Sequence, residues 1–165
     1  MIKIFDNFYT EQENDKVNSK LSEPHWSYTG GGETEEGDYF SHFWHMDDLE
    51  KDDFFLTLYA KTVSQLQLKN PSLIRIYANG QTAGQTGLPH EDDGDTTILY
   101  FPTIWKHVFG GHLYFLEDNN IKSVVEYKQN RLVVFPANKT HYAGPPERQY
   151  LGLRISLAFK VKHEQ

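Results

Sequence analysis

The C-terminal stretch Leu151–Phe159 reads LGLRISLAF and alternates between apolar and other residues. Because successive side chains of a strand point to opposite faces, one face would be apolar and the other would carry Arg154, Ser156 and Ala158. Two arrangements fit this pattern. In an edge strand the second face meets water. In a barrel strand it lines a pocket, where Arg154 can bind a carboxylate through two hydrogen bonds and Ser156 can add a hydroxyl.

Other short segments rich in β-forming residues precede this strand, separated by glycine, proline, asparagine and aspartate. The predicted strands are Leu73–Ala78, Thr96–Phe101, His112–Leu116, Ile121–Tyr127, Arg131–Phe135 and Tyr150–Val161. A series of short strands of this kind is typical of a sandwich or barrel.

The chain before Pro71 has a different pattern. Thr10 and Glu13 form a capping-box pattern and apolar residues follow at helical spacing, which predicts a helix over about 11–21. A second helical pattern covers about 47–69, and the glycine-rich stretch Gly30–Asp38 between the two is expected to be a loop. Helices followed by strands predict a mainly β architecture with helices packed on one outer face.

Length and composition limit the class of protein. A chain of 165 residues, 38% hydrophobic and 15% aromatic, is expected to form a single domain over 1–165 with a packed core. Within it we expect a helical support and loop region at 1–71 and a β core with the functional site at 72–162.

Charge and cysteine content limit the partners and the compartment. The net charge of −7 argues against nucleic acid as the main partner. The sequence has no apolar run long enough for a membrane span and no secretory signal pattern at Met1–Asp6, so we expect no membrane partner. It also has no cysteine, which excludes disulfides and thiolate metal sites and fits a cytoplasmic protein.

The candidate functional residues are histidines and a carboxylate. In an extended chain His90 and Asp92 point to the same side, and His141, at the exit of an apolar strand, can supply a third ligand from a distant segment. Such a set leaves open positions on an octahedral metal ion and, without thiolates, favours iron or manganese over structural zinc. Taken alone, the acidic run Glu91–Asp95 also fits a surface turn, whereas it lacks the ligand spacing of an EF-hand calcium loop.

An ordered set of motifs resembles a known family. The set comprises Arg75–Gln81, His90-x-Asp92, Gly110-Gly111-x-Leu113, Phe135-Pro136, His141 and Gly152-x-Arg154-x-Ser156. This order over about residues 72–160 is similar to that of the iron(II)- and 2-oxoglutarate-dependent dioxygenases, in particular their prolyl 4-hydroxylase-like branch.

The resemblance implies a double-stranded β-helix, or jelly-roll, core. It implies that His90, Asp92 and His141 bind Fe(II) and that Arg154 binds the distal carboxylate of 2-oxoglutarate. Arg148 is an alternative cation, but it lies in a loop with Pro145-Pro146 and outside the Gly-x-Arg-x-Ser setting.

Further residues are assigned to the co-substrate on the same basis. The family often places a tyrosine at the position of Tyr100 that helps to hold 2-oxoglutarate, although a core role is also open. Tyr77 shares a strand face with Arg75 and is expected to line the cavity, against co-substrate or substrate. The role of Trp105 stays open between stacking on a substrate and shielding the barrel rim. His112 is expected to be a barrel residue, with a fourth metal ligand as the alternative.

The implied activity is hydroxylation of an unactivated C–H bond with O₂, while 2-oxoglutarate is decarboxylated to succinate and CO₂. The prolyl-hydroxylase-like pattern favours a prolyl or other amino-acid side chain in a protein or peptide, and a free small metabolite is the alternative substrate. A non-catalytic, cupin-like jelly roll that only binds a metal or ligand is the alternative from a different class.

Overall fold

The computed structural model describes residues 1–33 and 40–164. The helices are α1 (Glu11–Leu21) and α2 (Asp53–Gln65), with short 3-10 turns at Leu49–Lys51 (η1) and His107–Phe109 (η2). The strands are β1 (Lys3–Asp6), β2 (Ser27–Glu33), β3 (Phe40–Met46), β4 (Pro71–Gln81), β5 (Thr96–Phe101), β6 (Leu113–Glu117), β7 (Asn120–Val125), β8 (Arg131–Pro136), β9 (His141–Ala143) and β10 (Arg154–His163).

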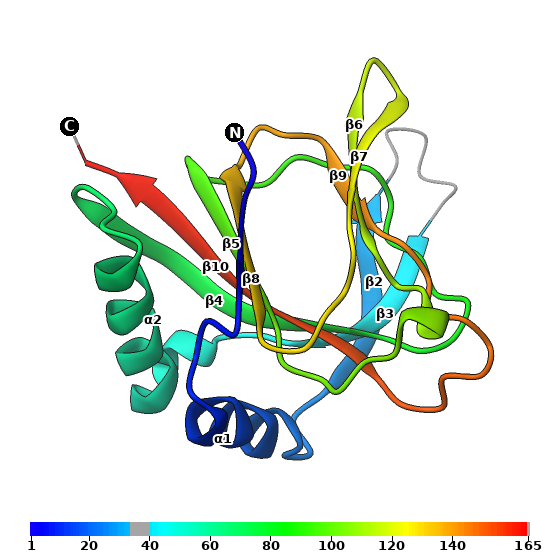
Figure 1. Cartoon of the computed structure of the whole chain (residues 1–165), viewed down its shortest axis with the longest axis horizontal. Helices are drawn as coiled ribbons and strands as arrows, with labels where there is room; N and C mark the ends of the chain where they lie inside the picture. Colours follow the sequence, from blue (N-terminus) through cyan, green and yellow to red (C-terminus); the bar gives the residue numbers. More distant parts are fainter. Residues whose placement is uncertain (34–39, 165) are drawn as a thin grey trace.

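The strands form two antiparallel sheets that face each other. The larger sheet has the order β1-β8-β5-β10-β4-β3-β2, and the smaller has the order β7-β6-β9. Figure 1 shows the smaller sheet on one side of the larger one and both helices on the other. This is the predicted jelly roll, mainly β with helices against one outer face.

The two faces of the larger sheet carry separate hydrophobic clusters. Alternate residues of β5 show the division: Ile98 and Tyr100 pack toward the helices, whereas Leu99 and Phe101 pack between the sheets. Strand β10 divides in the same way, since Leu157 belongs to the helix-side cluster. The other face of β10 carries Arg154, Ser156, Ala158 and Lys160, and all four of these residues are buried.

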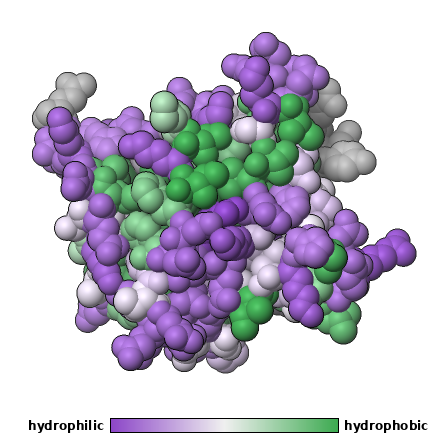
Figure 2. Space-filling model, viewed as in Figure 1, coloured by the Kyte–Doolittle hydropathy of each residue, from purple (hydrophilic) through white to green (hydrophobic). Residues whose placement is uncertain are grey.

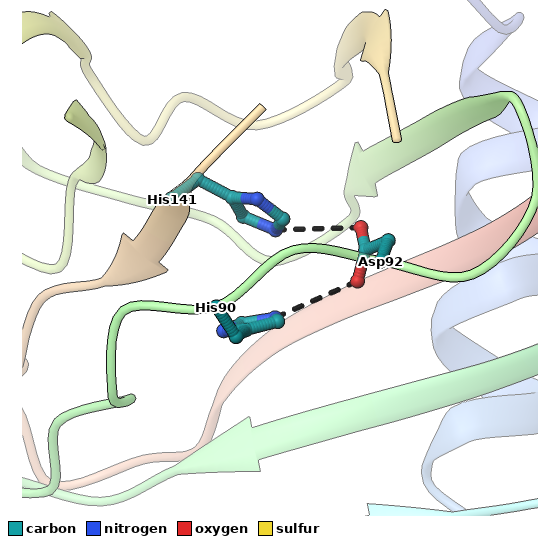
Figure 3. Close-up of side chains that lie close together, drawn as sticks. All are labelled: His90, Asp92 and His141. Carbon is teal, nitrogen blue, oxygen red and sulfur yellow. Dashed lines mark ion pairs between the residues drawn. The ribbon is translucent and has the colours of Figure 1, made fainter. Parts of the chain in front are cut away.

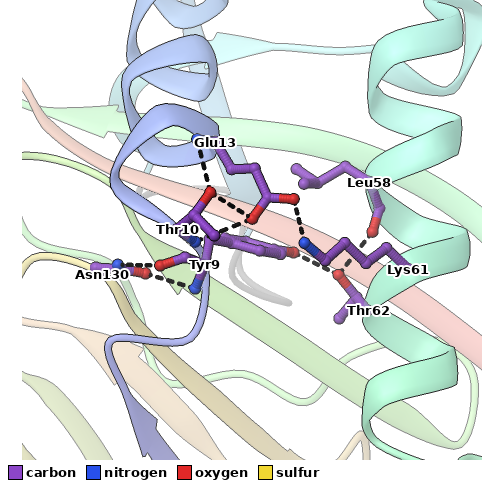
Figure 4. Close-up of polar contacts among 7 residues, drawn as sticks. All are labelled: Tyr9, Thr10, Glu13, Leu58, Lys61, Thr62 and Asn130. Carbon is purple, nitrogen blue, oxygen red and sulfur yellow. Dashed lines mark hydrogen bonds and ion pairs between the residues drawn. The ribbon is translucent and has the colours of Figure 1, made fainter.

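Polar contacts attach the helices to the larger sheet (Figure 4). The Thr10 side chain caps α1 in the predicted capping box with Glu13, which also pairs with Lys61 of α2. The Tyr9 hydroxyl contacts Thr62 Oγ1 of α2, while the Tyr9 amide donates to Asn130 Oδ1 at 2.9 Å, just before β8. These contacts fix both helices relative to the strands that carry the functional site.

The space between the sheets is apolar at one end of the molecule. Figure 2 shows a band of hydrophobic residues on the surface. In Figure 1, which is drawn from the same side, this band lies over the region between strands β5 and β8 and strand β9. Hydrophilic residues border this band. Between the two sheets lies the second core cluster, which includes the buried Phe115, Val133 and Phe135.

The sequence predicted most elements and missed four strands. The two predicted helices and the six predicted strands are present, with ends that differ by up to four residues in the strands and by up to six in the second helix, which was predicted over about 47–69. Strands β1, β2, β3 and β9 were not predicted, so the region 1–71 supplies strands to the larger sheet as well as helices.

The loop prediction for Gly30–Asp38 was wrong for its first part. Residues 30–33 belong to β2, in which Gly30 pairs with His42 of β3. The backbone of a glycine-rich segment can join a ladder when a partner strand supplies the hydrogen bonds, even though its intrinsic preference for a strand is low. Residues 34–38 lie outside the described part of the chain.

Among the described residues, none of the helices has the length and apolar character that crossing a membrane would require.

Candidate metal centre

The structure brings His90, Asp92 and His141 together (Figure 3). One ligand atom of each residue lies within 4.8 Å of the others. His90 Nε2 is 3.5 Å from Asp92 Oδ1, and His141 Nε2 is 3.4 Å from Asp92 Oδ2. Residues separated by about fifty positions in the sequence therefore converge on one point.

Backbone pairing produces this convergence. His141 begins β9 in the smaller sheet, and His90 lies in the connection from β4 to β5. The backbones of these two histidines form an isolated antiparallel bridge, with N–H to O=C distances of 3.0 and 2.9 Å. The amide of Asp92 donates to the carbonyl of Ala137 at 2.9 Å, which fixes the carboxylate two residues beyond His90.

The second ring nitrogen of each histidine fixes its orientation. His90 Nδ1 is 2.7 Å from the Leu88 carbonyl, and His141 Nδ1 is 2.8 Å from the Lys139 carbonyl. A carbonyl oxygen can only accept, so both Nδ1 atoms carry the proton in the neutral rings and both Nε2 atoms present a lone pair. Metal-binding histidines are usually held in this way.

Burial and nearby charges favour the metal-binding forms of Asp92 and His141, whereas at His90 they favour the protonated ring, whose Nε2 proton a metal ion would displace. Burial opposes ionisation of Asp92, but the hydrogen bond with His90 and the charge of Lys160 hold the pKa of Asp92 well below its usual range. Burial lowers the pKa of His141 to about 4, so this ring is neutral at pH 7. For His90 burial is again the largest single effect and acts in the same direction, but the hydrogen bonds to Asp92 and to the Leu88 carbonyl and the charge of Asp92 together outweigh it and raise the pKa.

A cavity of about 760 Å³ opens from the triad between the sheets. Tyr77 of β4 and Ser156 of β10 line it. The other lining residues are Phe43, His45, Asp47, Arg75, Asn79, Gln81, Gly87, Leu88, His90, Glu91, Asp92, Asp93 and Ala143. On the rim, Arg75 pairs with Asp93 at 2.9 Å and lies over the Tyr77 ring.

Arg154 is a fully buried cation beside this cavity. Its Nε donates to the Gly111 carbonyl at 2.6 Å and its Nη1 donates to Gln81 Oε1 at 3.0 Å. Its Nη2 is buried and, among the described residues, has no hydrogen-bond partner. Burial lowers the pKa of Arg154 only to about 10, so the guanidinium stays charged. A buried, charged donor without a partner fits a carboxylate ligand, since an unmet donor of this kind is costly.

The structure does not bring Tyr100 to the cavity. Its side chain lies on the helix side of β5, where the hydroxyl donates to Asn14 Oδ1 of α1 and the ring packs on Tyr9. The cavity side of β5 carries Thr97, Leu99 and Phe101 instead. The assignment of Tyr100 to 2-oxoglutarate is thus corrected, because β5 is apolar on both faces and its alternation does not show which face is which.

Two residues left open by the sequence lie next to Arg154. Trp105 donates to the Gly110 carbonyl at 3.0 Å and packs on Tyr127, whose ring lies under the Arg154 guanidinium. His112 accepts from the Tyr127 amide through Nδ1 at 3.3 Å. The structure thus places both residues in the packing around Arg154. Arg148, the alternative cation, is exposed.

Three residues at the site were not predicted: Thr97, Lys160 and Gln81. Thr97 Oγ1 donates to Asp92 Oδ2 at 2.6 Å, and the Lys160 ammonium pairs with the same oxygen. Lys160 lies six residues after Arg154, so extending the alternation of β10 by one more residue would have identified it. Gln81 lies opposite Arg154 in the β4–β10 ladder, a pairing that only the structure reveals.

Comparison with known proteins rests on structure. No family model matches the chain, and no curated protein matches its sequence. An oxidoreductase of the 2OG-Fe(II) oxygenase family from Burkholderia pseudomallei is similar in structure, with a TM-score of 0.77, 10% identity, and coverage of 99% of this chain and 86% of that one.

Two further structures are similar over nearly the whole chain. A prolyl hydroxylase from Trichoplax adhaerens, in complex with a peptide fragment of the hypoxia inducible factor oxygen degradation domain, has a TM-score of 0.71, 14% identity, and coverage of 98% and 83%. HygX from Streptomyces hygroscopicus, with nickel and 2-oxoglutarate bound, has a TM-score of 0.72, 11% identity, and coverage of 98% and 82%. The chain therefore has the fold of the 2OG-Fe(II) oxygenases.

Proposed function

We propose that the chain is an Fe(II)- and 2-oxoglutarate-dependent dioxygenase that hydroxylates an unactivated C–H bond. The observation that carries the proposal is a ligand set of two histidines and a carboxylate beside the cavity, together with the unpartnered Nη2 of Arg154, whose Nη1 donates to Gln81 in the cavity wall. The first fits a divalent iron with open positions, and the second fits the distal carboxylate of a dicarboxylic co-substrate.

The protein residues would hold and orient these groups. His90, Asp92 and His141 would bind the iron, while Arg154 and Ser156 would hold the far end of 2-oxoglutarate. Together the iron and 2-oxoglutarate would supply the oxidising chemistry, with release of succinate and CO₂. The buried apolar cluster between the sheets would help to exclude water from the bound groups.

The outer part of the cavity would bind the substrate. Its wall combines the Phe43 and Tyr77 rings with polar groups, including the Arg75–Asp93 pair. We infer an amino-acid side chain, prolyl or other, in a peptide or protein as the substrate. The similarity to a hydroxylase that binds a peptide supports this inference. Mass spectrometry of candidate peptides and free metabolites after incubation should reveal the gain of one oxygen atom and would separate these two substrate types.

The metal centre is tested without the substrate. Anaerobic addition of Fe(II) and 2-oxoglutarate should give a visible charge-transfer band, and admission of O₂ should then give succinate. His90→Ala or Asp92→Ala should abolish both the band and succinate formation while the variants stay folded. His25→Ala, which changes an exposed histidine outside the cavity, is the matched control. Sustained turnover in both ligand variants would falsify the proposal, and a colourless complex with unchanged metal affinity would favour a binding module.

A further inference from the structure

Lys160 is a buried lysine next to the metal ligands. Its relative exposure is 1%, and its ammonium contacts Asp92 Oδ2 and lies 3.3 Å from Thr97 Oγ1. The Tyr77 ring is 5.6 Å from the same nitrogen. Lysine is rarely buried to this extent, because removing an ammonium from water is costly unless a partner compensates for it.

Packing alone does not account for this lysine. It shares a face with Arg154, Ser156 and Ala158, and an apolar side chain at this position would fill the space without the cost of a buried charge. The compensating partner of Lys160 is the carboxylate of Asp92. The position of the charge therefore points to an effect on that carboxylate.

The two carboxylate oxygens of Asp92 have different partners. Oδ2 receives the Thr97 hydroxyl and the Lys160 ammonium and lies 3.4 Å from His141 Nε2. Oδ1 lies toward His90 Nε2, at 3.5 Å. The two donors on Oδ2 hold the carboxylate in place between the two histidines and partly offset its negative charge.

We infer that Lys160 is a positioning residue that holds the Asp92 carboxylate in place for iron binding and that favours ferrous over ferric iron. The inference rests on the proposed iron centre. A fixed positive charge behind the carboxylate weakens its donation and repels Fe(III) more than Fe(II), because the Coulomb energy grows with the charge of the ion and is little screened in a buried site. The centre is thereby kept in the oxidation state that the proposed reaction needs.

The test compares iron affinity and potential among variants at position 160. In iron-loaded protein without 2-oxoglutarate, Lys160→Met should shift the midpoint potential to lower values. This shift corresponds to a rise in the ratio of ferric to ferrous affinity of about tenfold to a hundredfold, the range typical for loss of a partner of a metal ligand. Lys160→Arg retains the charge and should restore a potential near that of the wild type. Lys162→Met, an exposed lysine two residues further along β10, is the matched control and should not change the potential.

A second variant separates charge from folding. Lys160→Gln keeps a hydrogen-bond donor without the charge, and it should lower the potential as Lys160→Met does even if the methionine variant does not fold. If Lys160→Gln keeps the wild-type potential, the inference is overturned while the proposed function stands. If the wild-type protein binds no iron, both are overturned.

Discussion

The guanidinium of Arg154 shows how one side chain can prepare a binding site before any ligand arrives. Two of its nitrogens are anchored, by Gly111 and Gln81, and its plane lies over the Tyr127 ring at 4.9 Å. The third nitrogen is oriented by these contacts and has no partner within the described chain. Most of the cost of ordering the side chain is therefore met by the fold rather than by the ligand.

Replacing Arg154 tests this arrangement. Arg154→Lys keeps a positive charge but loses the planar set of donors, so the affinity for 2-oxoglutarate should fall by about tenfold to a hundredfold, the value of one hydrogen bond to a charged group. The measurement is a 2-oxoglutarate titration of anaerobic, metal-loaded protein. Arg148→Lys is the control, and a loss of affinity in that variant alone would assign the co-substrate to the other arginine.

Tyr100 gives a complementary prediction. Tyr100→Phe removes the donor to the buried Asn14 side chain, so the free energy of unfolding should fall by about 1–2 kcal/mol in denaturant titrations. The affinity for 2-oxoglutarate should stay that of the wild type, because the hydroxyl lies on the helix side of β5. Weaker co-substrate binding at unchanged stability would contradict this placement.

At the scale of helices and strands, the sequence predicted an element correctly where a local pattern was enough to define it. The Thr10 and Glu13 pattern gave the N-terminus of α1, and the alternation in β10 gave its polar face correctly. Strands β1 and β9, with four and three residues, are too short to show a period, and they exist because they pair with β8 and β6. Their formation depends on tertiary contacts that no local window contains.

Strand β1 lies at the edge of the larger sheet and is held there partly by charge. Asp6 accepts from Arg131 Nε at 2.7 Å and from Lys128 Nζ at 2.8 Å. These hydrogen bonds, Arg131 first, hold the pKa of Asp6 well below its usual value, against a smaller opposing effect of burial. Because the carboxylate is partly exposed, solvent and salt screen the pair, and its contribution is modest.

The edge strand therefore gives a prediction that depends on pH. Asp6→Asn should lower the free energy of unfolding by about 0.5–1 kcal/mol at pH 7. The folded-state pKa is depressed, so the stabilisation is fully present above the unfolded pKa of about 3.9 and is lost as the pH falls through the folded-state pKa. Denaturant titrations of both proteins across this range should converge at low pH, and a constant difference would show that charge is not the cause.

At the scale of the whole molecule, the candidate site is assembled from both sheets. The ligand types and their order could be predicted from the sequence, because His90 and Asp92 are neighbours and His141 follows an apolar strand. The partners of these ligands could not, since Lys160, Thr97 and Gln81 reach the site only through the pairing of β10 with β5 and β4. The resemblance pointed to the candidate ligands, and the fold added the residues that contact them.

Ligand binding should stabilise the whole fold. Mn(II) with 2-oxoglutarate, at about one hundred times the dissociation constant, should raise the free energy of unfolding by about 2.7 kcal/mol, because only the folded chain assembles the site. Thermal unfolding with and without a chelator measures the effect, and His141→Ala should remove it. A gain in stability that persists in this variant would locate metal binding elsewhere.

The location of the triad has a mechanical consequence. His141 begins β9 of the smaller sheet, whereas Asp92 is tied through Thr97 to β5 of the larger one. A metal ion bound by both residues would connect the two sheets, so loss of the metal and separation of the sheets should occur together. Amide hydrogen exchange in β6 and β9 would then measure the fraction of protein that has metal bound. In protein without metal, proteases should cleave first where the two sheets meet.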